Sequence, residues 1–246
     1  FTHLIGYVIV EALCEMPQMN VRYSLSDGKP AIDERAHVGF GLAIDIQHAG
    51  ERRLVVPVIH QADTLTFTGF VEAYQDIISR AKAGSLSAED YQGATVTLTN
   101  PGTIGTTTSV PRLMNGQGVI IGVGAMDYPA EFAGVSPRKL ALLGIGKTMF
   151  VSSTYDHRVI QGAASGDFLR LLDLKLSGRD GFYDRVFTAL HIPVPPYVWE
   201  ADFEYDLERE KGKPARIAEL IQAYRSRGHL AADTDPLAYR VRRHPD

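Results

Sequence analysis

The sequence has little cysteine, little unbalanced charge and no long apolar run, and each shortage excludes a class of protein. Cys14 is the only cysteine among 246 residues, so no disulfide can form within the chain, which is typical of a reducing cytoplasm. The formal net charge is -4, and basic residues do not cluster with aromatic ones, so we expect no nucleic-acid partner. No apolar run approaches the roughly 20 residues that cross a bilayer, so we expect no membrane partner.

Motifs for nucleotides and metals are also missing. Residues 144–148 resemble the tail of a phosphate-binding loop, but Ala141 stands where its first glycine is required. The eight histidines show no His-x-x-x-His pair and no partner cysteines, so we expect no metal site. Gly39-Phe40-Gly41 lacks the following Gly-x-x-Gly turn, and we interpret it as a site of close backbone packing. Cys14 lies in an apolar helical pattern, where we expect a small core residue rather than a nucleophile.

The spacing of apolar residues gives the order of the secondary structure. It predicts helices over 2–13, 66–83, 163–176 and 182–190, and strands over 38–46, 53–59, 94–99, 119–125 and 148–155. Asp27-Gly28 predicts a turn between two short extended pieces. Because strands and helices are mixed without strict alternation, we expect a two-layer α/β sandwich with a mixed sheet rather than a doubly wound fold.

The composition changes after Leu190 and suggests three parts. Prolines stiffen the chain, and acidic residues then recur at every second position. We interpret 191–213 as a solvated linker, with an acidic docking strip as the alternative. Helical spacing returns over 214–227, so the predicted parts are a catalytic domain over 1–190, the linker, and a C-terminal segment over 214–246.

A polar cluster follows the last predicted strand. It contains Asp156, His157, Arg158 and Gln161, within an otherwise apolar stretch. A side chain at the end of a strand projects into a crevice, and hydrogen bonds from polar neighbours can fix the tautomer of an imidazole. The alternative for such a histidine is a purely structural role. We single out His157 as a candidate catalytic base.

A second cluster ends the strand over 94–99. Threonine alternates with apolar residues along this strand, and Asn100-Pro101-Gly102 then predicts a sharp turn. Thr99 is the last strand residue, so its hydroxyl can face whatever the turn lines. The alternative is a threonine of high strand propensity on a polar face.

Together the two clusters resemble the catalytic domain of the dihydrolipoyl acyltransferases of 2-oxo acid dehydrogenase complexes, relatives of chloramphenicol acetyltransferase. The motif of that family is Asp-His-Arg-x-x-Asp-Gly, and residues 156–162 read Asp-His-Arg-Val-Ile-Gln-Gly. The family also has a Ser/Thr-Asn-x-Gly segment, and residues 99–102 read Thr-Asn-Pro-Gly. Segments 54–59 and 118–124 match further strands. The resemblance covers residues 1 to about 190 and implies the chloramphenicol acetyltransferase-like fold, with its first helix and strand upstream of Phe1.

The resemblance implies a mechanism and a set of partners. His157 would take the proton of the CoA thiol, and the thiolate would attack the thioester of an acylated dihydrolipoamide. The hydroxyl of Thr99 would stabilise the oxyanion. The family builds this site at the interface of a homotrimer, with base and hydroxyl on neighbouring subunits, and the lipoyl group arrives on a domain of another chain. Ser109 and Arg112, after the threonine-rich loop, are the candidate CoA contacts.

The C-terminal segment resembles a different component. Residues 216–229 with 233–237 are similar to the start of the thiamine-dependent 2-oxoglutarate dehydrogenase component. Acyltransferase followed directly by that component is the order of the actinobacterial fused 2-oxoglutarate dehydrogenase/decarboxylases, which favours succinyl as the acyl group in the citric acid cycle. It implies the dehydrogenase and dihydrolipoyl dehydrogenase components as partners. Thiamine diphosphate and Mg would bind only in the dehydrogenase part outside this chain.

Gln161 departs from the family motif, which has Asp at this position. A carboxylate there orients the loop through charge-assisted hydrogen bonds, whereas Gln keeps hydrogen bonds without the charge. The fused actinobacterial branch also carries Gln, so we expect an active succinyltransferase in which Gln161 orients the loop. The alternatives are a degenerate, trimerising scaffold for the dehydrogenase and an acetyltransferase for a free small molecule, which the dehydrogenase-like tail disfavours.

Overall fold

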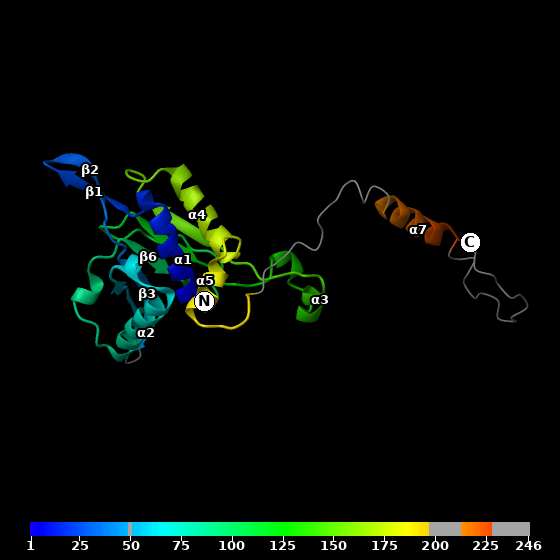
Figure 1. Cartoon of the computed structure of the whole chain (residues 1–246), viewed down its shortest axis with the longest axis horizontal. Helices are drawn as coiled ribbons and strands as arrows, with labels where there is room; N and C mark the ends of the chain where they lie inside the picture. Colours follow the sequence, from blue (N-terminus) through cyan, green and yellow to red (C-terminus); the bar gives the residue numbers. More distant parts are fainter. Residues whose placement is uncertain (49–50, 197–212, 228–246) are drawn as a thin grey trace, which may run out of the picture. The chain divides into compact units, whose positions relative to one another are not determined.

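A computed structural model describes residues 1–48, 51–196 and 213–227 of the chain. The chain divides into two compact units, Phe1–Pro196 and Tyr197–Asp246. The first unit has a layer of helices against one face of a mixed sheet (Figure 1). The predicted two-layer α/β sandwich is therefore confirmed.

The helical layer is built from segments that are far apart in the sequence. Helices α1 (Thr2–Glu15) and α4 (Gly162–Leu176) pack against each other, and α2 (Phe67–Ala83) packs on the sheet and against α5 (Phe182–Ala189). All four agree with the predicted helices to within two residues at either end. Among the described residues, no helix is long and apolar enough to cross a membrane.

The sheet has strand order β4-β3-β6-β7-β8, and β5 also pairs with β3. Its members are β3 (Phe40–His48), β4 (Glu51–Val55), β5 (Val58–Ile59), β6 (Val96–Thr99), β7 (Val119–Val123) and β8 (Val151–Tyr155). Strands β3, β6 and β7 run parallel, whereas β4 and β5 are antiparallel to β3 and β8 is antiparallel to β7. The carboxyl end of β6 therefore lies at one end of the sheet along the strand direction, and the carboxyl end of β8 lies at the opposite end.

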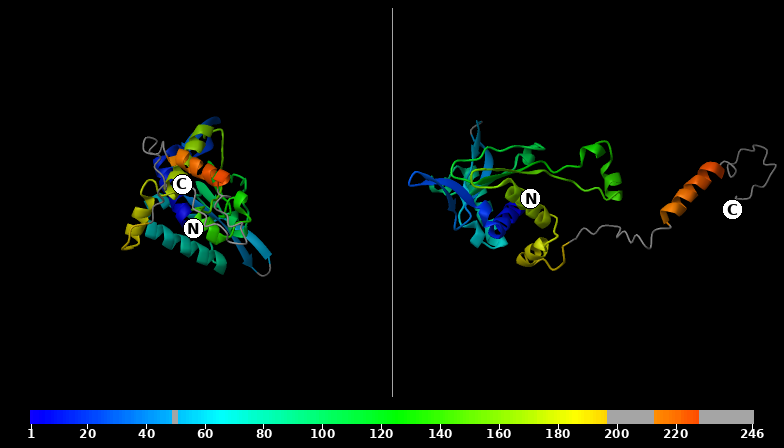
Figure 2. Two further views of the ribbon diagram at one scale, coloured as in Figure 1. Left: turned by 90° about the vertical axis from the view of Figure 1, so that its right-hand side faces the viewer. Right: turned by 90° about the horizontal axis from the view of Figure 1, so that it is seen from above.

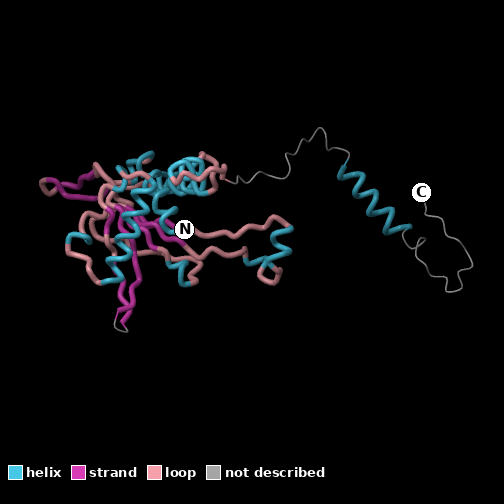
Figure 3. Tube along the Cα trace, turned by 60° about the horizontal axis from the view of Figure 1, so that its bottom comes forward, coloured by secondary structure: helices cyan, strands magenta, loops and turns pink. Residues whose placement is uncertain are grey.

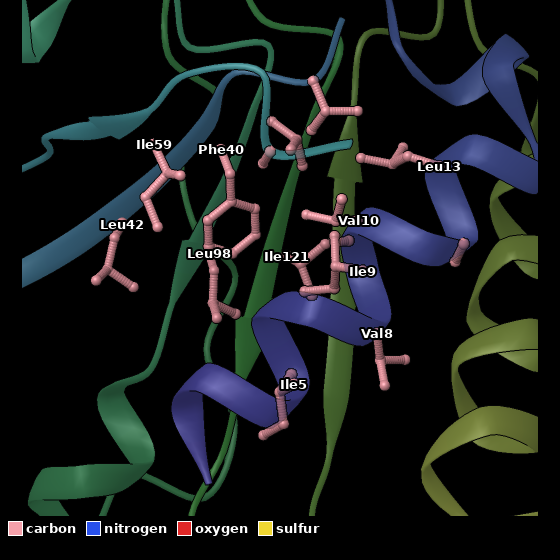
Figure 4. Packing of buried hydrophobic residues seen from close by; sticks show 14 of the residues in the cluster. Ile5, Val8, Ile9, Val10, Leu13, Phe40, Leu42, Ile59, Leu98 and Ile121 are labelled. Carbon is pink, nitrogen blue, oxygen red and sulfur yellow. The ribbon is translucent and has the colours of Figure 1, made fainter. Parts of the chain in front are cut away.

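One face of the sheet is apolar and lies beneath the helices. Phe40 of β3 and Leu98 of β6 are both fully buried. They share one cluster with Ile5, Ile9 and Leu13, which project from α1 toward the strands (Figure 4). Successive side chains of a strand alternate between faces, so this burial fixes which residues face the opposite side.

The opposite face carries small and hydroxyl-bearing residues. Gly41 of β3 lies beside Thr97 of β6, and a Cβ at Gly41 would come within 2.5 Å of the Thr97 hydroxyl oxygen. A Cβ at Gly39 would lie 1.9 Å from the carbonyl oxygen of Gly93. Only glycine permits these approaches. The interpretation of Gly39-Phe40-Gly41 as a close-packing feature is confirmed.

A two-stranded hairpin stands apart from the main sheet (Figure 1). Strands β1 (Val21–Ser26) and β2 (Lys29–Glu34) pair antiparallel, with Ser26 opposite Lys29. The two residues between them, Asp27 and Gly28, have φ of 52° and 75°. Positive φ at both positions is the geometry of a tight hairpin turn, which Asp-Gly favours, and the predicted turn is confirmed.

A long arm between β7 and β8 was not predicted. Its two extended sides, joined by a bridge between Asp127 and Thr148, lead away from the sheet to α3 (Pro137–Leu142) near the tip (Figures 2 and 3). Ser136 caps this helix by accepting a hydrogen bond from the Lys139 N–H, and proline occupies its first turn. Proline in the first turn after a serine cap is typical of a helix start, although the helix was not predicted from it.

Two expectations are wrong in detail. Cys14 is exposed rather than part of the core, because it shares a helix face with Glu11, three residues earlier, while Leu13 faces inward. The strand predicted over 53–59 is two strands, β4 and β5. Pro57 lies between them and has no N–H for a ladder hydrogen bond, which accounts for the break.

A buried lysine ties α4 to α1. Lys175 is 2% exposed, and its Nζ lies 2.6 Å from Glu15, 3.1 Å from Asp180 and 3.3 Å from Glu11. A buried cation is tolerated only with such partners, and removing one of them leaves an uncompensated charge. This cluster fixes α4, the helix that follows the polar turn at His157.

In the second unit, the described part is helix α7 (Lys213–Arg227), as the spacing over 214–227 predicts. Its apolar face is exposed at Ile217, Leu220, Ile221 and Tyr224. Residues 197–212 of the predicted linker and 228–246 of the dehydrogenase-like segment lie outside the described residues. The boundaries of the predicted domains stay predictions.

Candidate active site

The candidate base, His157, is exposed on a turn between β8 and α4. The N–H of Asp156 donates to the Gly118 carbonyl at 2.9 Å, and the N–H of Ile160 donates to the Asp156 carbonyl at 2.9 Å. The side chain of Ile160 is 1% exposed, so the turn is also held from below by the core. The imidazole lies with its ring centroid 5.5 Å from that of Tyr155. An accessible histidine thus projects from a firmly held backbone.

The residues on either side of His157 pair with each other. The Arg158 Nη2 donates to the Asp156 carboxylate at 2.6 Å and its Nε donates at 2.9 Å. The guanidinium also lies 3.8 Å from the ring centroid of Tyr23 in the hairpin. The hydrogen bonds from Arg158 lower the pKa of the Asp156 carboxyl, which keeps it ionised at neutral pH. Two residues of the predicted polar cluster, Asp156 and Arg158, therefore form an ion pair across the position of His157 in the chain. We call this pair the clamp.

A polar cavity of about 650 Å³ adjoins this clamp. It lies between hairpin residues 22–24, loop residues 113–117, Asp156 and Arg158. Gln117 is 4% exposed, and its Oε1 has no hydrogen-bond partner among the described residues. Buried carbonyl oxygens without a donor are rare, so Gln117 holds an unsatisfied acceptor next to this cavity.

The second candidate, Thr99, lines a cavity of about 400 Å³ at the carboxyl end of β6. The turn after it is anchored, because the Asn100 side-chain amide donates to the Thr2 hydroxyl at 2.9 Å. A Cβ at Gly102 would come within 2.3 Å of the Gly124 backbone, so this turn needs glycine. Thr99 is thus a partly buried residue at a cavity, and its role in catalysis stays a prediction.

The structure does not bring Thr99 and His157 together within one chain. Thr99 pairs with Gly122 near the end of β7, whereas Tyr155, the last residue of β8, pairs with Val119 at the start of β7. Three steps of about 3.3 Å separate those positions on β7, and His157 lies further away beyond Tyr155. A hydrogen-bonded pair needs a separation of about 3 Å. The two groups cannot act on one substrate atom from the same chain.

The remaining predicted residues have weaker support. Gln161 occupies the N-cap of α4 without a side-chain cap hydrogen bond. Ser109 lies near Gly122 on the Thr99 side, where its carbonyl accepts from the Ser152 hydroxyl at 2.9 Å, and Arg112 is exposed on the same loop. No three His, Cys, Asp or Glu side chains are placed to hold a metal ion, as far as the described residues go.

Sequence reasoning missed an ion pair next to Thr99. Asp45 of β3 and Arg52 of β4 line the same cavity as Thr99. The Arg52 Nε donates to the Asp45 carboxylate at 2.6 Å, and its Nη2 contacts the same oxygen. This pair depends on how β3 and β4 align, and no local pattern in the sequence signals it.

Comparison with known proteins identifies relatives of the chain. Residues 1–178 match the family model described as 2-oxoacid dehydrogenases acyltransferase (catalytic domain). The chain is 55% identical over 250 residues to the multifunctional 2-oxoglutarate metabolism enzyme of Mycobacterium sp. (strain JLS), covering 100% of this chain and 20% of that protein. The chain thus spans about one fifth of the length of this curated relative. Thr99 and His157 both fall within the matched family segment.

Solved structures show the same fold. A truncated catalytic core of the 2-oxoacid dehydrogenase multienzyme complex from Thermoplasma acidophilum superposes with a TM-score of 0.57 at 25% identity, covering 71% of this chain and 72% of that one. The cubic core of the pyruvate dehydrogenase multienzyme complex gives a TM-score of 0.53 at 28% identity, covering 70% and 66%. Both similarities extend over most of the first unit's length.

Proposed function

Because the chain belongs to the family of 2-oxoacid dehydrogenase acyltransferase catalytic domains, we propose that it transfers succinyl between dihydrolipoamide and CoA. The observation that carries the proposal is the exposed imidazole of His157 on an anchored turn. A base on a rigid turn needs little reorganisation before it moves a proton. The choice of succinyl is supported by the relative named for 2-oxoglutarate metabolism, since decarboxylation and oxidation of 2-oxoglutarate yield a succinyl group.

The proposed reaction is a direct transfer between two thiols. His157 removes the proton of the CoA thiol, and the thiolate forms a bond to the carbonyl carbon of succinyl-dihydrolipoamide. The Thr99 hydroxyl donates to the oxyanion that develops, an interaction worth about 2.7–4 kcal/mol. When the intermediate collapses, the bond to the lipoyl sulfur breaks and His157 returns the proton to that sulfur. No nucleophile of the protein is needed.

The separation of Thr99 from His157 supports a site built from two copies of the chain. In our proposal, one copy supplies the base and its neighbour supplies the hydroxyl, within a homotrimer. The solved cubic core shows that a structural relative assembles into a larger core. The lipoyl-bearing domain would come from another chain, and the dehydrogenase and dihydrolipoyl dehydrogenase components would be further partners in the cytoplasm.

The competing function is a scaffold that trimerises without transferring an acyl group. It is favoured by Gln161, because its side chain makes no cap hydrogen bond where the family motif has Asp. The intact clamp between Asp156 and Arg158 weighs against it, because a degenerate site has no need of a fixed histidine turn.

Transfer from succinyl-CoA to dihydrolipoamide tests the proposal directly. We expect His157→Ala to lower kcat by about 10²–10⁴-fold, the usual contribution of a general base. His60→Ala is the matched control, since His60 is also exposed but lies on a loop beyond β5. If the assembled wild-type chain transfers no succinyl group, the scaffold function replaces this one.

A further inference from the structure

The cavity at Thr99 is lined by a positively charged side chain, Arg52, that the proposed mechanism does not use. Ala43 of β3 pairs with Thr99, and Asp45 lies two residues further along β3 on the same face. Asp45 pairs with Leu54, and Arg52 lies two residues from Leu54, again on that face. Strand alternation therefore places Arg52 with Thr99, on the side of the sheet away from the helices.

The guanidinium of Arg52 is held but not saturated. Asp45 accepts from its Nε and contacts its Nη2, so one edge of the planar group is occupied. A guanidinium has five N–H donors, and its other edge can take a second carboxylate in a bidentate pair. The side chain of Arg52 is 64% exposed, so this edge is not buried by the chain itself. Asp45 thus orients a cation that can bind another anion.

The proposed substrate has an anion to bind. A succinyl group ends in a free carboxylate, three carbon–carbon bonds from the thioester carbonyl, and Thr99 is proposed to hold the oxygen of that carbonyl. We propose that Arg52 binds the free carboxylate of the acyl group and thereby selects dicarboxylic over monocarboxylic acyl groups. The proposal rests on the proposed acyl transfer at Thr99.

The rest of the cavity fits the middle of such a group. Leu54 and Ile104 line it and are 66% and 65% exposed. Exposed apolar side chains beside a cation suit two methylene groups that precede a carboxylate. Among the described residues that line this cavity, Arg52 is the one cation. The cavity therefore has an oxyanion donor, apolar walls and a carboxylate receptor.

The phosphates of CoA are the other anionic groups that the proposed substrates carry. They lie at the far end of the pantetheine arm from the reacting sulfur, whereas Arg52 shares a cavity with Thr99. The acyl carboxylate is accordingly the occupant that the geometry favours.

The test compares two acyl donors that differ in this carboxylate. Succinyl-CoA and acetyl-CoA are titrated calorimetrically into the assembled chain, as wild type, Arg52→Gln and Arg53→Gln. Arg53 is the matched control, because it is one residue along β4 and so on the other face. We expect wild type and Arg53→Gln to prefer succinyl-CoA, and Arg52→Gln to lose about 10–100-fold in that preference, as for a charged hydrogen-bonded pair.

Transfer kinetics separate this inference from the proposed function. The ratio of kcat/KM for succinyl over acetyl donors should fall in Arg52→Gln and recover in part in Arg52→Lys, which keeps the charge but loses the fork. Equal weakening of both donors by Arg52→Gln would overturn the inference and assign Arg52 to CoA or to folding. Equal binding of both donors to wild type would overturn it as well. Binding preference without any transfer would instead reject the proposed function and leave the carboxylate site standing.

Discussion

The two ends of the sheet along the strand direction differ in the groups that a substrate would meet there. At the end of the sheet that follows the carboxyl end of β8, His157 is exposed, and its neighbours Asp156 and Arg158 form an ion pair. At the opposite end, which follows the carboxyl end of β6, Thr99 and the cationic side chain of Arg52 line one cavity. The first end has an imidazole that can accept a proton, whereas no histidine is among the described residues that line the cavity at the second end. In our proposal, one chain therefore carries two complementary halves of a site.

The largest expected effect is the recovery of transfer activity when two inactive variants are combined in one oligomer. His157→Ala and Thr99→Val should each be nearly inactive alone, with Thr99→Val losing about 10²–10³-fold in kcat. When the two variants are co-expressed, about a quarter of the interfaces in a randomly mixed oligomer pair an intact Thr99 with an intact His157. Purification through two different tags removes the unmixed trimers, and each mixed trimer has one productive interface out of three, so we expect about a third of wild-type activity.

Each variant co-expressed with a differently tagged copy of itself is the control for that experiment. These oligomers should stay at the residual activity of the single variants. A site contained within one chain predicts the same low activity for the mixture, so an unrestored mixture would refute the division of the site between copies.

A smaller effect is expected from the clamp around His157. Arg158→Met removes both the ion pair with Asp156 and the stacking on Tyr23, so the turn should lose its fixed geometry. We expect kcat to fall by about 10-fold while KM for CoA changes little, since a misplaced base weakens the transition state more than binding. Arg170→Met is the control, because Arg170 pairs with Asp167 on the exposed surface of α4.

The same variant has a predicted signature in acid. Arg158 lowers the pKa of Asp156 in the folded chain, so the pair contributes stability above the ordinary carboxyl pKa of about 3.9. That contribution disappears as the pH falls through the lowered folded-state pKa. The unfolding free energies of wild type and Arg158→Met should therefore converge on acidification from pH 5 toward pH 3, as chemical denaturation would measure. A constant difference would mean that Asp156 is not the titrating partner.

Much of the fold follows from local sequence patterns. Thr66 and Gly84 mark both ends of α2, where the Thr66 hydroxyl accepts from an N–H and Gly84 has φ of 68°. Asp27-Gly28 fixes the hairpin turn in the same local way. Cys14 was misplaced because an apolar helix pattern does not say where its buried face ends. The arm and α3 were missed because their apolar residues remain largely exposed and give no periodic signal.

The site was predictable only as separate pieces. His157 and Thr99 each stand at a strand end beside a recognisable motif, so the sequence named both. Their separation follows from strand order and direction, which are set by non-local pairing. The pair of Asp45 and Arg52 depends on the register of β3 with β4, where a shift by one residue would move Arg52 to the other face. Contacts of this kind are decided by the assembled sheet.

The smallest expected effect is that of a substitution at Gln161, and it distinguishes the proposed transferase function from the scaffold function. This residue is the N-cap of α4 and makes no side-chain cap hydrogen bond. Asp is a far better N-cap residue and also interacts favourably with the positive end of a helix. We expect Gln161→Asp to raise the unfolding free energy by about 1 kcal/mol. We also expect it to change kcat less than about 3-fold, because the turn is already held by Asp156, Arg158 and the core. A rise of kcat by more than 10-fold would show that Gln161 leaves the wild-type site impaired, and would move the balance toward a scaffold.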